Sequence, residues 1–141
     1  MNKKSIRFIT LLSMLAITIF ISTSVYAGSN TVFGVHFNLE ANSGAFWPVY
    51  PNYETFVSSE TWYPTPNDDI YVDQIQAVGD VFIDDVFITR IDQFDFDSSF
   101  AYADTAGRQS GQKILIDCYH YAHYSAYNET LSTYTNDYEY R

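Results

Sequence analysis

Short runs in which apolar and polar residues alternate make up most of this sequence. The clearest is Lys113–Tyr124, KILIDCYHYAHY. Successive side chains of a β-strand point to opposite faces, so this alternation predicts one strand. One face would carry Ile114, Ile116, Cys118, His120 and Ala122, with Cys118 as a small buried side chain and His120 near the end of the sheet. The other face would carry Leu115, Asp117, Tyr119, Tyr121 and His123.

Two further runs near the start of the alternating region also favour strands. Thr31–Glu40 alternates from Phe33 onward, which predicts a half-buried strand that ends at Asn42–Gly44. Within it, His36 falls on the polar parity, so we expect a solvated histidine. Tyr53–Trp62 lies between prolines, which predicts an edge strand because proline cannot donate to a central ladder.

The second half of the chain continues the pattern. Ile70–Val78 and Val81–Ile91 flank Gly79-Asp80, which predicts a hairpin with a two-residue type II′ turn. In Phe94–Tyr102 the aromatic residues share one parity and the aspartates the other, as on a strand with a solvated acidic face. Leu131–Tyr140 predicts a last strand with its even-numbered tyrosines on one face.

These runs amount to six or seven short strands, and no long apolar segment has helical spacing. The predicted fold is all-β, an antiparallel two-sheet β-sandwich of the immunoglobulin-like or jelly-roll-like kind, with a small β-barrel as the alternative.

The first 27 residues have the composition of a signal peptide. Lys3, Lys4 and Arg7 precede an apolar run, and Val25-Tyr26-Ala27 fits a cleavage site. A membrane anchor is disfavoured because the apolar run is short for a span. We therefore expect a signal peptide at 1–27, of bacterial type, and a secreted, extracellular mature domain at 28–141 that has no membrane association after cleavage.

The net charge restricts the ligands that the protein can bind, and the cysteine content restricts the bonds that can stabilise its fold. Residues 28–141 hold 4 Lys and Arg against 17 Asp and Glu, a net charge of −13. Such an acidic surface repels nucleic acid, so we exclude it as a ligand. The single cysteine, Cys118, allows no intramolecular disulfide, so the fold must depend on its core.

Two sets of residues could ligate metal, although solvation or burial explains both more simply. Cys118 and His120 share a predicted strand face and could hold a transition metal, but their spacing matches no closed zinc motif. Asp68 and Asp69 lie in a loop and could contribute to calcium binding, but they lack the run of oxygen ligands of a calcium loop. We therefore predict no cofactor.

Aromatic side chains are the best candidates for ligand contact. Tyrosine and tryptophan give large contact areas and keep a polar atom in water, which favours binding surfaces. The candidate binding residues are Tyr119, Tyr121, Tyr134, Tyr138, Trp47 and Trp62. Trp47 and Trp62 could equally cover one end of the core.

The function that the sequence favours is a non-catalytic extracellular binding module whose ligand is a glycan, a peptide or a protein. One alternative is a small secreted glycan hydrolase that uses paired carboxylates, for which Glu60, near Trp62, is the closest candidate. Another is a secreted antagonistic, bacteriocin-like protein. No catalytic residue is predicted.

Overall fold

The computed structural model describes residues 28–65 and 68–141, and the predicted signal peptide lies outside the described residues. Eight strands follow one another, with a short 3-10 helix, η1 (Ser125–Tyr127), before the last. The strands are β1 (Gly28–Phe33), β2 (Asn38–Val49), β3 (Asn52–Trp62), β4 (Val72–Ile83), β5 (Val86–Ser98), β6 (Phe100–Arg108), β7 (Lys113–Tyr124) and β8 (Glu129–Tyr140).

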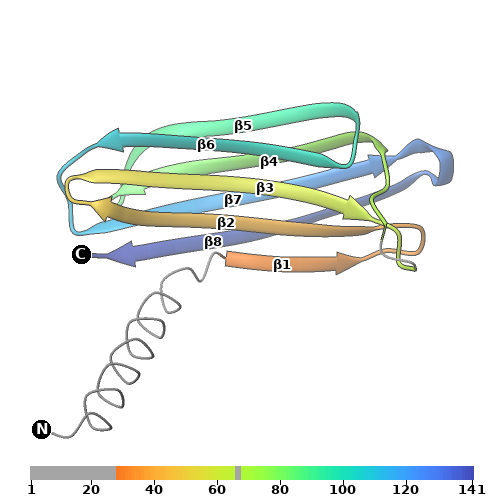
Figure 1. Ribbon diagram of the computed structural model, residues 1–141, viewed down its shortest axis with the longest axis horizontal. Helices are drawn as coiled ribbons and strands as arrows, with labels where there is room; N and C mark the ends of the chain where they lie inside the picture. The colour runs from red at the N-terminus through yellow and green to blue at the C-terminus, as the bar shows by residue number, and fades with distance from the viewer. Residues whose placement is uncertain (1–27, 66–67) are drawn as a thin grey trace, which may run out of the picture.

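The strands form two four-stranded antiparallel sheets. Sheet A has the order β1-β2-β3-β6, and sheet B has the order β5-β4-β7-β8. Figure 1 shows that the strands run along the long axis of the molecule. The predicted antiparallel β-sandwich is therefore confirmed, and the barrel alternative is wrong because the sheets remain separate.

The hydrophobic core lies between the sheets. Strand alternation turns Leu39 and Val57 inward from sheet A and Ile75, Val81 and Ile116 inward from sheet B, and all five are fully buried. Burial of one such side chain contributes roughly 1.5–3 kcal/mol relative to exposure. Residues brought together from both sheets therefore hold the two layers against each other.

The predicted strand Lys113–Tyr124 is β7, with the same bounds. Its even-numbered residues from Ile114 to Ala122 are all buried, and the odd-numbered residues between them are half-buried or exposed. β7 lies in the interior of sheet B between β4 and β8, so the predicted assignment of its two faces is confirmed.

The first predicted strand is wrong. Thr31–Glu40 contains the end of β1 and the start of β2, joined by the turn in which the Gly34 N–H donates to the Phe37 carbonyl oxygen (3.0 Å). Phe33 and Val35 are consequently 77% and 80% exposed instead of facing inward. The predicted end at Asn42–Gly44 is also wrong, because β2 continues to Val49.

The place of one strand and the position of one turn also differ from the predictions. β3 occupies the predicted segment but is an interior strand, between β2 and β6, instead of an edge strand. β4 continues through Gly79-Asp80, and the hairpin turn lies at Asp84-Asp85, with φ angles of 49° and 65°. Positive φ at both central residues is typical of a type I′ turn, which asparagine and aspartate tolerate better than most residues.

The Phe94–Tyr102 segment is divided between the two sheets. β5 ends at Ser98 and β6 begins at Phe100, so the chain crosses from sheet B to sheet A at Ser99. Phe94 and Phe96 are exposed, whereas Asp95 lies on the face turned toward sheet A, directly opposite the buried Ile75. The expected solvated acidic face is therefore wrong for this strand.

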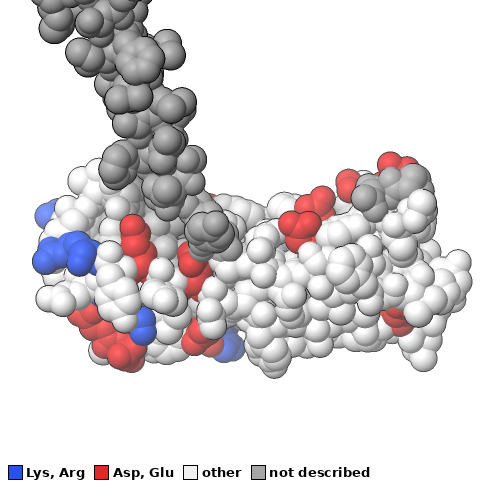
Figure 2. All heavy atoms as spheres, turned by 90° about the horizontal axis from the view of Figure 1, so that it is seen from below, with Lys and Arg blue, Asp and Glu red and all other residues white. Residues whose placement is uncertain are grey.

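The few basic residues gather toward one end of the sandwich. Arg108 ends β6, Lys113 begins β7, and Arg141 follows β8. In Figure 2 the blue side chains lie toward that end, whereas red side chains occur along the length of the visible face. On the visible face, the other end therefore carries acidic side chains without nearby arginine or lysine.

Candidate functional site

The outer face of sheet B carries the predicted tyrosines. Alternation turns Tyr119 and Tyr121 of β7 outward, and the same holds for Tyr134 and Tyr138 of β8. We call the outer face of sheet B that carries these four side chains the tyrosine face. Tyr119 and Tyr134 lie directly opposite each other, with ring centroids 5.1 Å apart and planes inclined by 48°.

A shallow groove of about 420 Å³ crosses the tyrosine face beside this pair. Its other wall includes Asp80 and Arg90, whose guanidinium donates two hydrogen bonds to the carboxylate at 2.7 and 2.8 Å. These hydrogen bonds hold the pKa of Asp80 below its ordinary value. Asp117 and Asn136 also line the groove, so it combines two aromatic rings with several polar groups.

The tyrosine face extends onto β5 through residues that the sequence did not identify. Phe94 and Phe96 point outward, and their rings pack edge to face with centroids 4.9 Å apart. Gln76 donates to Asp92 (3.0 Å) on the same face. The two-residue spacing of Phe94 and Phe96 indicates that they share one strand face. Their hydrophobicity alone, however, favours the face turned toward the core.

A second exposed aromatic surface lies on the outer face of sheet A. Phe56 of β3 and Phe100 and Tyr102 of β6 form what we call the aromatic row. The Tyr102 ring lies 6.3 Å from each of the other two rings, with interplanar angles of 18° and 10°. Gly44, opposite Phe56, accommodates that ring, because a Cβ at Gly44 would lie 2.2 Å from the Phe56 Cε1 atom.

Carboxylates adjoin one end of the aromatic row. Glu60 of β3 lies directly between Glu40 of β2 and Phe100 of β6 in the sheet register. Asp69 forms an isolated antiparallel bridge with Trp62, two residues along β3. Burial, followed by the negative charges of Asp69 and Glu40, raises the pKa of Glu60. Glu40 and Asp69 are therefore close enough to disfavour the ionised form of Glu60.

The two tryptophans do not form a common site. Trp47 lies near the β2–β3 turn, where its ring is 5.7 Å from the ring of Tyr50. Trp62 ends β3 and pairs with Asn38 at the start of β2. They occupy opposite ends of the same pair of strands, so a platform that includes both would have to span most of the sheet.

Cys118 and His120 lie inside the sandwich. His120 is fully buried, and its Nδ1 and Nε2 atoms lie 2.9 Å from Ser59 Oγ and 2.8 Å from Thr135 Oγ1. Ser59 donates its hydroxyl proton to the Gln76 carbonyl oxygen (2.8 Å), so Nδ1–H donates to Ser59 and Nε2 accepts from Thr135. Both ring nitrogens are thus engaged by hydroxyl groups.

Burial has opposite effects on these two titratable groups. Desolvation raises the pKa of the Cys118 thiol to about 12 and lowers the pKa of His120 to about 4. In each case the neutral form is favoured, as expected for groups between two sheets. This arrangement accounts for both residues as parts of the core.

The other predicted metal ligands are at the surface. Asp68 and Asp69 are exposed in the segment that joins β3 to β4. Within residues 28–65 and 68–141, no group of three or more His, Cys, Asp or Glu side chains is arranged to hold a metal ion.

His36 has partners that the sequence did not indicate. Its ring stacks on Tyr127 with centroids 3.7 Å apart and planes within 4°, and its Nδ1 atom lies 2.8 Å from Glu129 Oε2. The Glu129 carboxylate also accepts the N–H groups of Val35 (2.6 Å) and His36 (3.0 Å). Burial raises the pKa of Glu129, but these hydrogen bonds outweigh it, and the pKa lies below its ordinary value. The Glu129 carboxylate therefore holds the β1–β2 loop against the start of β8 through these hydrogen bonds.

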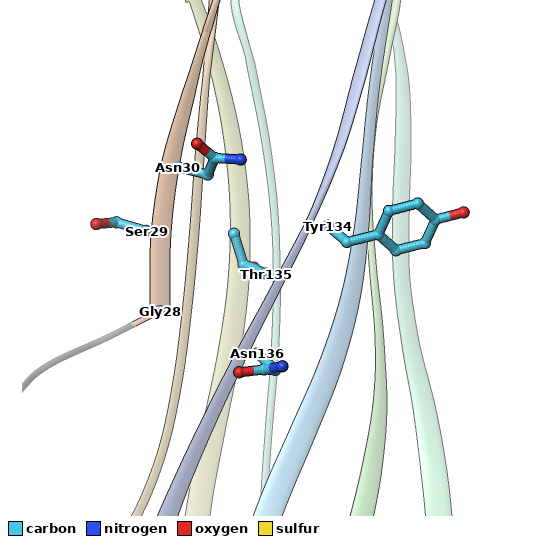
Figure 3. Close-up of a pocket in the computed structure, with 6 residues that line it drawn as sticks. All are labelled: Gly28, Ser29, Asn30, Tyr134, Thr135 and Asn136. Atoms are coloured by element: carbon cyan, nitrogen blue, oxygen red, sulfur yellow. The ribbon is translucent and has the colours of Figure 1, made fainter.

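A cleft of about 290 Å³ separates the start of β1 from β8. Figure 3 shows Asn30 and Thr135 in the space between the strands, while the Tyr134 ring points away from β1. Asn30 Nδ2 donates to Thr133 Oγ1 (2.6 Å), and a Cβ at Gly28 would lie 1.9 Å from the Asn136 carbonyl oxygen. These contacts join β1, at the edge of sheet A, to β8, at the edge of sheet B. The cleft is therefore part of the packing between these two strands.

No family model matches the chain, and comparisons with curated proteins and with solved structures likewise find no match. Among the residues that the structure describes, none form a helix long and apolar enough to cross a membrane.

Proposed function

We propose that the protein is a secreted, non-catalytic binding module and that its ligand is an extended glycan bound on the tyrosine face. The observation that carries this proposal is the groove beside the Tyr119–Tyr134 pair. Its polar wall includes Asp117 and Asn136, so stacking surfaces and hydrogen-bonding groups lie within reach of the same ligand.

The chemistry of the groove supports a sugar chain over a folded protein partner. Aromatic faces pack against the C–H faces of sugar rings, and carboxylate and amide groups can bond the surrounding hydroxyls. Protein interfaces instead have a core depleted of charged residues. The Asp80–Arg90 ion pair in the wall of the groove fits a wet sugar site better than such a core.

The proposed secretion has its own test. Amino-terminal sequencing of the protein recovered from culture medium should begin at Gly28. A protein that retains residues 1–27 and stays with the cells would contradict this part of the proposal.

Binding is tested by sedimentation with insoluble polysaccharides and by a soluble glycan array. Tyr119→Ala and Tyr134→Ala should each weaken binding by about fivefold to tenfold, because loss of one aromatic contact costs on the order of 1 kcal/mol. Tyr71→Ala is the matched control, since Tyr71 is 69% exposed and precedes β4, away from the groove. Equal losses in all three variants, or binding only to peptides or proteins, would refute the proposal.

One observation favours a second candidate, a glycan hydrolase. Glu40 and Glu60 face each other across β2 and β3, and the pKa of Glu60 is raised by burial and by two neighbouring carboxylates. An acid and a second carboxylate are the usual pair in such enzymes. Release of reducing ends from a polysaccharide, abolished by Glu60→Gln and by Glu40→Gln, would support hydrolysis over binding alone.

A further inference from the structure

The outer face of sheet A presents an exposed aromatic surface separate from the tyrosine face. Phe100 and Tyr102 are each 44% exposed, and Phe56 stacks on Tyr102 from the neighbouring strand. All three rings are nearly parallel to one another. Side chains that only covered the core would point inward, so this arrangement leaves ring surface available to a ligand.

Among the residues that the structure describes, no Lys or Arg side chain is paired with the carboxylates beside the aromatic row. Three of the four described Lys and Arg side chains contact other groups: Arg90 binds Asp80, Lys113 binds Asp85, and Arg141 lies over the ring of Tyr50. The fourth, Arg108, pairs with Asn52 at the far end of β6 from Phe100.

Like charges directly opposite each other destabilise a sheet, so the Glu40–Glu60 pair carries a cost that a cationic ligand would remove. Asn38 lies on the same strand face as Glu40 and is only 4% exposed. Its Oδ1 atom accepts no hydrogen bond from any residue in the described part of the chain. Asn38 pairs with Trp62, two residues along β3 from Glu60, so its buried acceptor lies beside the site and not within reach of a ligand. Three carboxylates thus adjoin the same end of the row.

We propose that this face binds a cationic amino-sugar polymer, in which sugar rings stack on Phe56, Tyr102 and Phe100 while a free ammonium group lies at Glu60. Stacking accounts for the parallel exposed rings, and the ammonium compensates the adjacent carboxylates. Phe100, directly opposite Glu60, adds a cation–π contact for the same ammonium. The site uses no residue of the tyrosine face.

Aromatic rings beside carboxylates favour an amino-sugar chain over two simpler ligands, a neutral glycan and a basic peptide. A neutral glycan would stack on the rings but leave Glu40, Glu60 and Asp69 uncompensated. A basic peptide would compensate the acids but would not need three nearly parallel rings. An amino-sugar chain with free amines uses both features.

The test compares two short glucosamine oligomers of equal length, one with free amines and one fully N-acetylated, in a mildly acidic buffer. Calorimetry should detect the free-amine oligomer binding at least about tenfold more tightly than the acetylated one, with an affinity that falls as salt rises. Glu60→Gln should weaken binding by about fivefold, and Tyr102→Ala by a similar factor.

Matched controls distinguish specific binding at the aromatic row from general attraction of a cationic oligomer to an acidic protein. Asp85→Asn removes the same charge from the β4–β5 turn, outside both proposed sites, and should leave the affinity unchanged. Binding of the free-amine oligomer that is lost in Tyr134→Ala but kept in Tyr102→Ala would place the oligomer on the tyrosine face, and it would overturn this proposal without affecting the first one. Thermal melts verify folding, and Glu60→Gln should fold normally because it removes a repelled charge.

Four further results would each overturn the proposal. They are equal binding of the acetylated oligomer, an equal loss in Asp85→Asn and Glu60→Gln, equal binding of an oligolysine of the same charge, and release of reducing ends from the oligomer.

Discussion

Acid should destabilise this protein through His120, because that side chain is buried as a neutral base. In the folded state Nε2 accepts the Thr135 hydroxyl proton, and Nδ1–H donates to Ser59. A second ring proton would turn Nε2 into a donor and leave an imidazolium between the sheets. Unfolding exposes the ring to water, where it gains the proton freely.

The magnitude follows from the two pKa values. Unfolded histidine has a pKa of 6.5, and burial lowers the pKa of His120 in the fold to about 4. Between these values the unfolded chain binds the additional proton, so the free energy of unfolding decreases as the pH falls. A difference of about 2.5 units corresponds to roughly 3 kcal/mol. The contribution is complete above pH 6.5 and is lost on acidification to pH 4.

Urea denaturation at a series of pH values measures the effect. His120→Gln keeps a donor and an acceptor but does not titrate, so it should lower stability at neutral pH and flatten the pH dependence between 6.5 and 4.5. His123→Gln is the control, because His123 lies on the outer face of β7 and contacts Thr130. The reasoning is refuted if wild type and His120→Gln lose the same free energy over this range.

Three other results are expected. Cys118 should resist thiol reagents in the folded protein and react after denaturation, because burial raises its pKa to about 12; rapid labelling of the folded protein would contradict this. Asp85→Gly should raise the free energy of unfolding in urea by about 0.5 kcal/mol, since glycine accepts the φ of 65° without strain; a loss would show that the Lys113 ion pair matters more. Glu129→Ala should lower it by about 1–2 kcal/mol, because the N–H groups of Val35 and His36 lose their acceptor, and Glu129→Gln should recover part of this loss.

Strand faces could be predicted wherever a strand lies in the interior of its sheet. β7 has neighbours on both sides and the core beneath it, so each inward position must be apolar or fully hydrogen-bonded. The sequence therefore predicted the two faces of β7 and the burial of Cys118. His120, which was expected near the end of the sheet, is instead fully buried, because Ser59 and Thr135 satisfy its ring nitrogens. β5 is an edge strand, where the demand for burial is weaker, and there Phe94 and Phe96 point outward.

Turn positions were harder to predict because glycine occurs both in turns and at strand positions where no side chain fits. Gly79 lies within β4 because a Cβ there would approach Ile116 Cδ1 to 2.7 Å, so the glycine is a packing requirement and not a turn signal. The real turn uses Asp84, whose Oδ1 accepts the N–H groups of Gln112 and Lys113 at 2.9 Å. That stabilisation comes from a loop distant in sequence, which local patterns cannot reveal.

The candidate sites differ in how much they depend on strand neighbours. The tyrosine face follows largely from alternation within β7 and β8, which are consecutive strands, so their pairing was a natural expectation. The aromatic row needs β6 to pair with β3, although β4 and β5 lie between them in sequence. Alternation places Glu60 and Trp62 on one face, but only the register brings Phe100 beside Glu60. Side-chain direction is a local property and register is not, and for this reason the acidic end of the aromatic row emerges only from the assembled sheet.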